Sequence, residues 1–119
     1  MKDFILNRVI FYSGLNYDSL KSKCCLKIYC RARQVLIYLL YEYTIMSLKQ
    51  IGKLLNRDHS TIHHNKKVII NMKTILSYAN DPQMVMLRTI EKETIQYRQN
   101  QEIKQDWETD SSLGININY

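Results

Sequence analysis

One stretch decides the fold of this chain: Arg57-Asp58-His59-Ser60-Thr61-Ile62-His63-His64. It places a helix-capping residue, Asp58, directly before a cluster of polar side chains. A carboxylate at the N-cap position accepts hydrogen bonds from the free N–H groups of a first helical turn. We therefore expect a helix to begin at Asp58 and to present the polar cluster at its N-terminal end. A capped, solvated surface helix would account for the same residues, so the surrounding chain has to decide between the two readings.

A short helix is expected immediately before this stretch. Ser47 and Gln50 have the spacing of a capping box, in which each side chain satisfies a backbone donor near the other residue. Its expected buried residues are Leu48, Ile51, Leu54 and Leu55. Asn56 tolerates the left-handed conformation that a sharp helix exit needs. Two helices joined by a tight turn form a helix-turn-helix, whose second helix enters the DNA major groove by its N-terminal end.

Apolar periodicity predicts further helices and an all-α fold. A first helix is expected from the cap residue Asp3 to Tyr12, and a second from Asn16 to about Lys23, with Ser13-Gly14 between them. A longer helix is expected over residues 28–44, with core positions Val35, Leu36, Leu39, Leu40 and Tyr43. The helix that begins at Asp58 is expected to bury Ile62, Ile69, Met72 and Leu76.

Composition divides the chain into three parts. Residues 1–80 are expected to form the helix-turn-helix domain. Asp81-Pro82 is a helix start, because proline favours the first helical position, and a polar C-terminal helix is expected over residues 81–110. Residues 111–119 are expected to form a flexible tail.

The positive charge is concentrated in the middle of the chain. The formal net charge is +6, but residues 21–73 hold eleven Lys or Arg against two acids, a local charge of +9. Residues 1–20 balance at zero, and residues 74–119 carry four basic and seven acidic groups, a charge of −3. A basic central segment is the charge distribution that binding to a polyanion requires.

Several classes of function find no support. The chain lacks the phosphate-cradling pattern G-x-x-x-x-G-K-[ST], so we expect no nucleotide binding, no cofactor and no enzyme activity. No apolar run is long enough for a transmembrane helix. Cys24, Cys25 and Cys30 form neither a disulfide framework nor a zinc pattern, which favours free thiols in a reducing cytoplasm and no metal site.

The motifs together resemble a known family. In chain order they are Arg31-Ala32-Arg33-Gln34-Val35, Tyr38-Leu39-Leu40, Ser47-Leu48 with Ile51-Gly52, and Arg57 to Ile62 with His64. This series resembles the C-terminal DNA-binding domain of the bacterial replication initiator DnaA. The stretch GLNYDSLKS, which ends at Ser22, is similar to the opening of that domain, and the resemblance covers roughly Asp3 to Lys73.

The resemblance implies an all-helical domain that binds a short duplex element, the DnaA box. Asp58, His59, Ser60 and Thr61 would then face base edges or nearby phosphates, and His64 would lie at the phosphate backbone. Arg33 and Gln34 would clamp a phosphate from the long helix. The remaining candidates for DNA contact are basic: Lys27, Arg31, Lys49, Arg57 and Lys67. This division of work fits general chemistry, because phosphate contacts set the register and base contacts set the sequence.

Three features depart from the family pattern. Cys24-Cys25 replaces a basic pair, one member of which reads the minor groove, so Lys23 or Lys27 would have to substitute for it. The turn before Arg57 is one residue shorter, with Asn56 where two glycines are common. Lys49 stands where proline is frequent and adds a candidate phosphate contact.

The sequence thus predicts a stand-alone, sequence-specific double-stranded DNA-binding protein without the ATPase of a full initiator. It would act in replication initiation or its regulation. The alternatives are a transcriptional regulator of a phage or mobile element, and a module that binds a protein partner or itself through the C-terminal helix. Residues that would support such a coiled coil are Met84, Leu87, Ile90, Ile95 and Ile103. The third class of function is a nuclease that uses Asp106, Glu108 and Asp110.

Overall fold

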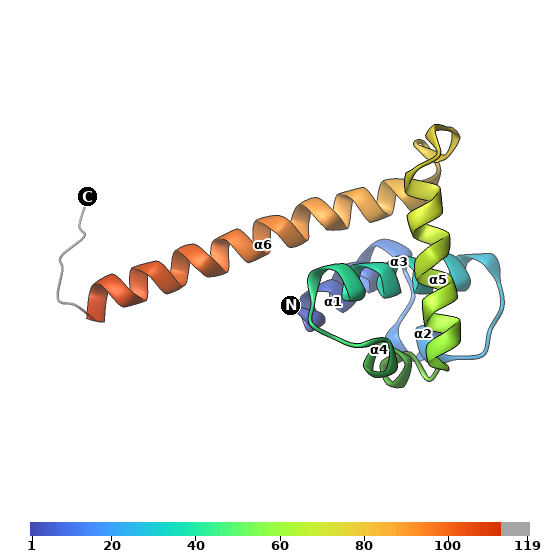
Figure 1. The fold of residues 1–119 in the computed structure, drawn as a ribbon, viewed down its shortest axis with the longest axis horizontal. Helices are drawn as coiled ribbons and strands as arrows, with labels where there is room; N and C mark the ends of the chain where they lie inside the picture. Colours follow the sequence, from blue (N-terminus) through green and yellow to red (C-terminus); the bar gives the residue numbers. More distant parts are fainter. Residues whose placement is uncertain (113–119) are drawn as a thin grey trace.

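Six α-helices and one short 3-10 helix make up the described part of the chain (Figure 1). The computed structural model describes the backbone of residues 1–112 and the side chains of residues 1–101. The elements are α1 (Lys2–Ser13), α2 (Tyr17–Lys21), α3 (Lys27–Tyr43), α4 (Leu48–Leu55), α5 (His59–Lys73), η1 (Leu76–Tyr78) and α6 (Pro82–Ser112). Residues 1–112 contain no strand, so the predicted all-α class is confirmed. Most of the predicted tail, from residue 113 onward, lies outside the described residues.

Most of the helix boundaries predicted from local sequence signals are confirmed. Ser47 and Gln50 form the complete capping box, with bonds of 3.2 and 2.8 Å. Gly14 ends α1 with a φ of 74°, and Asp81 Oδ1 accepts a hydrogen bond from the Gln83 N–H at 2.9 Å. The expected cap at Asp3 is wrong: α1 begins two residues earlier, with Met1 as its N-cap, so Asp3 lies in the first helical turn.

Helix α3 is the centre of the molecule. It packs against α1, α2, α4, α5 and α6, and its positions from Val35 to Leu40 are all buried. The fully buried residues that surround it are Ile5, Val9, Leu20, Ile51, Leu55, Ile62, Ile69, Leu87 and Ile90. Burial of each such side chain contributes about 1.5–3 kcal/mol, so this one cluster accounts for most of the drive to fold.

The predicted buried stripe of α5 is correct for its first three turns and wrong at its end. Ile62 and Ile69 are fully buried and Met72 is half-buried, but Leu76 is 92% exposed. The reason is that α5 stops at Lys73 and the chain turns into η1, so the helical periodicity no longer applies at residue 76.

The first half of α6 belongs to the same core as the preceding domain. Met84, Leu87 and Ile90 pack into the cluster around α3, so the core extends past the boundary that composition placed at residue 80. These three side chains are therefore unavailable for a coiled coil with another chain. Ile103 and the acidic residues Asp106, Glu108 and Asp110 lie beyond the described side chains.

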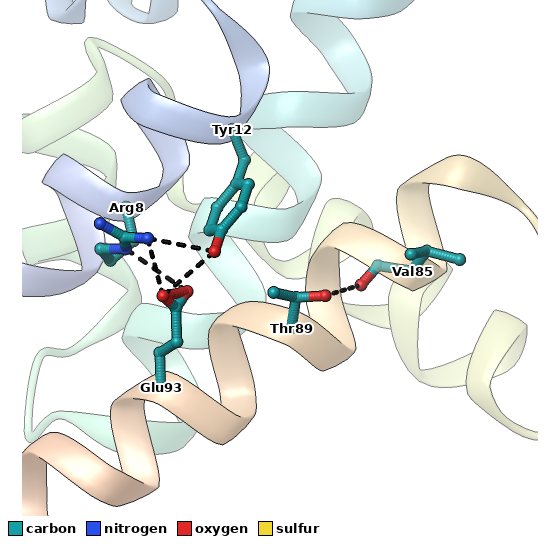
Figure 2. A network of polar contacts seen from close by, with 5 residues as sticks. All are labelled: Arg8, Tyr12, Val85, Thr89 and Glu93. Atoms are coloured by element: carbon teal, nitrogen blue, oxygen red, sulfur yellow. Dashed lines mark hydrogen bonds and ion pairs between the residues drawn. The ribbon is translucent and has the colours of Figure 1, made fainter.

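Polar contacts hold α6 against α1 and α3. Glu93 accepts hydrogen bonds from Arg8 and Tyr12 of α1, at 2.7 and 3.1 Å (Figure 2). Glu91 accepts from Tyr43 of α3 at 2.8 Å and pairs with Lys73 of α5 at 3.2 Å. Past these contacts α6 runs away from the helical body (Figure 1). No helix in the described range is long and apolar enough to cross a membrane.

The turn between α4 and α5 is tight because of two special backbone positions. Asn56 adopts the left-handed conformation, with a φ of 56°, as the sequence predicted. The Arg57 N–H then donates to the Gly52 carbonyl at 2.7 Å. The tight turn brings the Arg57 carbonyl against Gly52. A Cβ added to Gly52 would lie 2.4 Å from the Arg57 carbonyl oxygen. Only glycine fits at position 52 without moving the backbone.

We expect Gly52→Ala to lower the free energy of unfolding by about 1–3 kcal/mol, the usual cost of forcing extra atoms into a packed site. Urea denaturation followed by circular dichroism measures it. Lys53→Ala is the matched control, since Lys53 is the next residue of the same helix and is exposed. It should change stability by no more than about 0.5 kcal/mol. Equal stability of the two variants would show that the turn relaxes freely.

Candidate nucleic-acid interface

The N-terminal half of α5 presents a polar face to solvent. Ile62 and Ile69 point into the core, which turns the opposite side of the helix outward. The exposed side chains on that side are His59, Ser60, Thr61, His64 and Lys67. The structure therefore places on one helix five of the residues that the sequence assigned to DNA contact.

Asp58 organises the first turn in a way the sequence did not predict. It occupies the N-cap position, but its side chain makes no cap hydrogen bond to the helix. Its carboxylate instead accepts a hydrogen bond from the Ser60 hydroxyl and lies 3.3 Å from His59 Nδ1. The Ser60 hydrogen bond is the main cause that lowers the pKa of Asp58, assisted by His59. Asp58 therefore stays ionised and orients the two polar side chains that follow it.

Helix α4 adds two exposed lysines beside this turn. Lys49 and Lys53 are one helical turn apart, and with Asn56, Arg57 and His59 they line an open groove between α4 and the start of α5. The sequence motifs pointed to Lys49 but not to Lys53. The i, i+4 spacing of the two lysines on a predicted helix was the signal that would have found it.

Arg33 does not lie on this surface. Its side chain is 5% exposed, and its guanidinium donates to the carbonyl oxygens of Leu20, Ser22 and Cys24 at 2.7, 2.7 and 2.8 Å. These are carbonyls at the end of α2 and in the loop that follows it. The geometry thus gives Arg33 a structural role. Its guanidinium has no donor directed toward solvent, as the phosphate clamp implied by the resemblance would require.

Arg57 also binds carbonyls at the end of α2, from the turn before α5. Its guanidinium donates to the carbonyls of Lys21, at 3.2 Å, and of Ser22. Two guanidinium groups therefore share the Ser22 carbonyl. Burial, followed by the positive charge of Arg33, lowers the pKa of Arg57. Arg57 thus joins the start of α5 to the end of α2. It is half-buried, whereas the sequence predicted an exposed side chain that contacts DNA.

Gln34 also has internal partners. Its Nε2 donates to Asn65 Oδ1 of α5 at 3.4 Å, and its Oε1 accepts from Gln83 Nε2 of α6 at 2.8 Å. Gln83 in turn donates to the Arg31 carbonyl at 3.1 Å. This chain of amides joins three helices, and Gln34 remains half-exposed within it.

Lys27 and Arg31 lie in a different groove. Both are exposed, and they line a hollow between the end of α1 and the starts of α3 and α6, with Tyr12, Ile28 and Met86. No residue of α4 or α5 lines that hollow. The structure thus separates these two cations from the groove that Lys49 and His59 share.

Three further basic side chains of α5 contact other residues or are partly buried. Lys66 lies over the Tyr41 ring at 4.0 Å, and Lys73 is paired with Glu91. His63 is half-buried, and burial, with the nearby charges of Lys67 and Lys66, lowers its pKa. Among the residues whose side chains are described, no three His, Cys, Asp or Glu form a metal-binding group.

A tight helix-turn-helix whose second helix opens with an exposed polar turn defines a DNA-binding class of domain. Comparison with known families also identifies a helix-turn-helix domain. The model described as the bacterial DnaA protein helix-turn-helix matches residues 2–69, which is more than half of the chain. The chain belongs to this family.

Two curated relatives place the match within a larger protein. The chromosomal replication initiator proteins DnaA of Clavibacter sepedonicus and of Clavibacter michiganensis subsp. michiganensis are each 38% identical over 78 residues. The matched region covers 64% of this chain and 16% of each relative. The chain thus corresponds to a small part of these initiators, and the whole of α6 lies beyond the family match, which ends at residue 69.

We expect Arg33→Met to lower the free energy of unfolding by about 1–3 kcal/mol, because it leaves buried carbonyls without their donor. Arg31→Met is the matched control: the same change on the same helix, at an exposed side chain. It should cost no more than about 0.5 kcal/mol. Urea denaturation measures both. Weakened DNA binding by a fully stable Arg33→Met protein would instead restore the phosphate role.

Proposed function

We propose that this domain binds double-stranded DNA sequence-specifically at an element like the DnaA box, in replication initiation or its regulation, and without ATPase activity of its own. The observation that carries the proposal is the exposed polar turn at the start of α5, set beside the α4 lysines by the tight turn at Asn56. Membership of the DnaA helix-turn-helix family supports the same reading.

Base reading would fall to the first turn of α5. The Thr61 methyl group suits the C5-methyl of thymine, and its hydroxyl can bond a neighbouring base. Asp58 can accept from the amino group of cytosine. Its hydrogen bond with Ser60 and its proximity to His59 hold these side chains in place before DNA arrives, which lowers the entropy lost on binding.

Phosphate contacts would come from the lysine and histidine side chains around this turn. Lys49 and Lys53 border the groove on the α4 side, while His64 and Lys67 continue along the exposed face of α5. Such contacts set the register of the protein on the duplex, and they supply affinity by releasing counterions. Arg33 and Arg57 would contribute indirectly, by fixing the position of α5 relative to α2.

We expect Thr61→Ala to weaken binding to a DnaA-box duplex by about 1–3 kcal/mol and to leave binding to a scrambled duplex nearly unchanged. Thr74→Ala makes the same chemical change at the opposite end of α5 and should alter neither affinity. Fluorescence anisotropy with labelled duplexes at one salt concentration measures all three proteins. Equal affinity of the unmodified protein for the box and the scrambled duplex would refute sequence-specific binding.

Lys49→Gln and Lys67→Gln should each reduce the slope of log K against log salt concentration by about 0.9, the value for one lost phosphate contact. Both box and scrambled duplexes should show the change, since phosphates carry no sequence. Lys92→Gln removes an exposed lysine of α6 and is the control with an unchanged slope. If Lys92→Gln lowers the slope as much as the other two variants, the effect comes from net charge rather than from contact.

A further inference from the structure

Two cysteines flank the N-cap of α3. Leu26 is the N-cap of α3, so Cys25 occupies the position before the cap and Cys30 the fourth helical position. Side chains at these two positions pack against each other across a helix start, the arrangement called a hydrophobic staple. Here both members of the staple are thiols, and both are free.

The Cys30 thiol already contacts the backbone of Cys25. Cys30 Sγ lies 3.6 Å from the carbonyl oxygen of Cys25. Cys25 is exposed, and its Sγ is directed at the Lys23 carbonyl, 3.4 Å away. An exposed side chain changes rotamer in nanoseconds or less, so the Cys25 sulfur is free to turn toward Cys30.

The surroundings favour this pair over one that includes Cys24. The Cys24 carbonyl is held by Arg33 at 2.8 Å, and Cys24 lies one residue farther from the helix start. Arg33 Nη1 is also 3.9 Å from Cys30 Sγ, so a positive charge faces the sulfur. The loop over residues 22–26 is non-helical and can supply the small adjustment that brings two Cβ atoms to disulfide distance.

We propose that Cys25 and Cys30 are a site of reversible disulfide formation, oxidised by a small-molecule disulfide. One thiolate attacks that disulfide, forms a mixed disulfide and releases one small thiol. The second thiolate then attacks the protein sulfur of the mixed bond and releases the second small thiol. The two cysteines lose two electrons in total, the oxidant gains them, and the two thiol protons end on the released thiols.

The bond would staple the loop after α2 covalently to the first turn of α3. That loop provides the Ser22 and Cys24 carbonyls that Arg33 and Arg57 hold. Oxidation would thus fix a segment that the two guanidinium groups already position. This site stands on the cysteine geometry alone and does not depend on the proposed DNA element.

Oxidised glutathione is the probe for the test, applied to the full chain and followed by alkylation of free thiols and trypsin digestion. Cleavage after Lys23, Lys27 and Arg31 separates Cys24-Cys25-Leu26-Lys27 from Ile28-Tyr29-Cys30-Arg31. A disulfide to Cys30 joins these two peptides, and mass spectrometry detects the product. The expected result is an intramolecular cross-link in the unmodified protein and in Cys24→Ser, reversed by dithiothreitol.

Cys25→Ser and Cys30→Ser should both lose the cross-link. Cys25 is exposed, so its variant is expected to fold, and circular dichroism checks this for each protein. A cross-link that persists in Cys25→Ser and disappears in Cys24→Ser would overturn the assignment. The absence of any cross-link, or cross-linking only between separate chains, would overturn the proposal itself.

Discussion

The position of α5 depends on two guanidinium groups that bind the same short run of carbonyls. Arg33 approaches the end of α2 from the buried side of α3, and Arg57 approaches it from the turn before α5. They meet at the Ser22 carbonyl. Helix α2 has only five residues, and its carbonyl ends would otherwise be poorly satisfied in a partly buried setting. By supplying those donors, the two arginines join α2, α3 and α5 through one polar centre.

This arrangement separates two functions that basic residues serve in one small domain. Cations that satisfy internal carbonyls hold the helices in place, while Lys49, Lys53 and Lys67 remain free at the surface. Placing the first group inside has an energetic cost: burial, followed by the positive charge of Arg33, disfavours the charged form of Arg57 and lowers its pKa. The carbonyl hydrogen bonds offset that cost, because bonds to charged donors are stronger than neutral ones.

The sequence predicted the features that depend on neighbours along the chain. The capping box at Ser47, the left-handed Asn56 and the helix start at Asp81 each rest on contacts within a few residues. It failed where partners are distant. The burial of Arg33 depends on carbonyls 9 to 13 residues away, and no local pattern marks an arginine for the interior. The packing of Met84, Leu87 and Ile90 was missed because polar residues dominate the composition of α6.

Helix α6 has two halves with different sources of order. Glu91, Glu93 and the stacked rings of Phe4 and Tyr97, 4.3 Å apart, fix its first half to the domain. Starting a helix is the costly step and extending it is nearly free, so the anchored turns act as a nucleus for those that follow. From Arg98 to Ser112 the helix extends by roughly 20 Å at 1.5 Å per residue. The contacts of the first half of α6 with α1 and α3 therefore set the direction of the distal turns. They also lower the cost of forming those turns, because the helix is already nucleated.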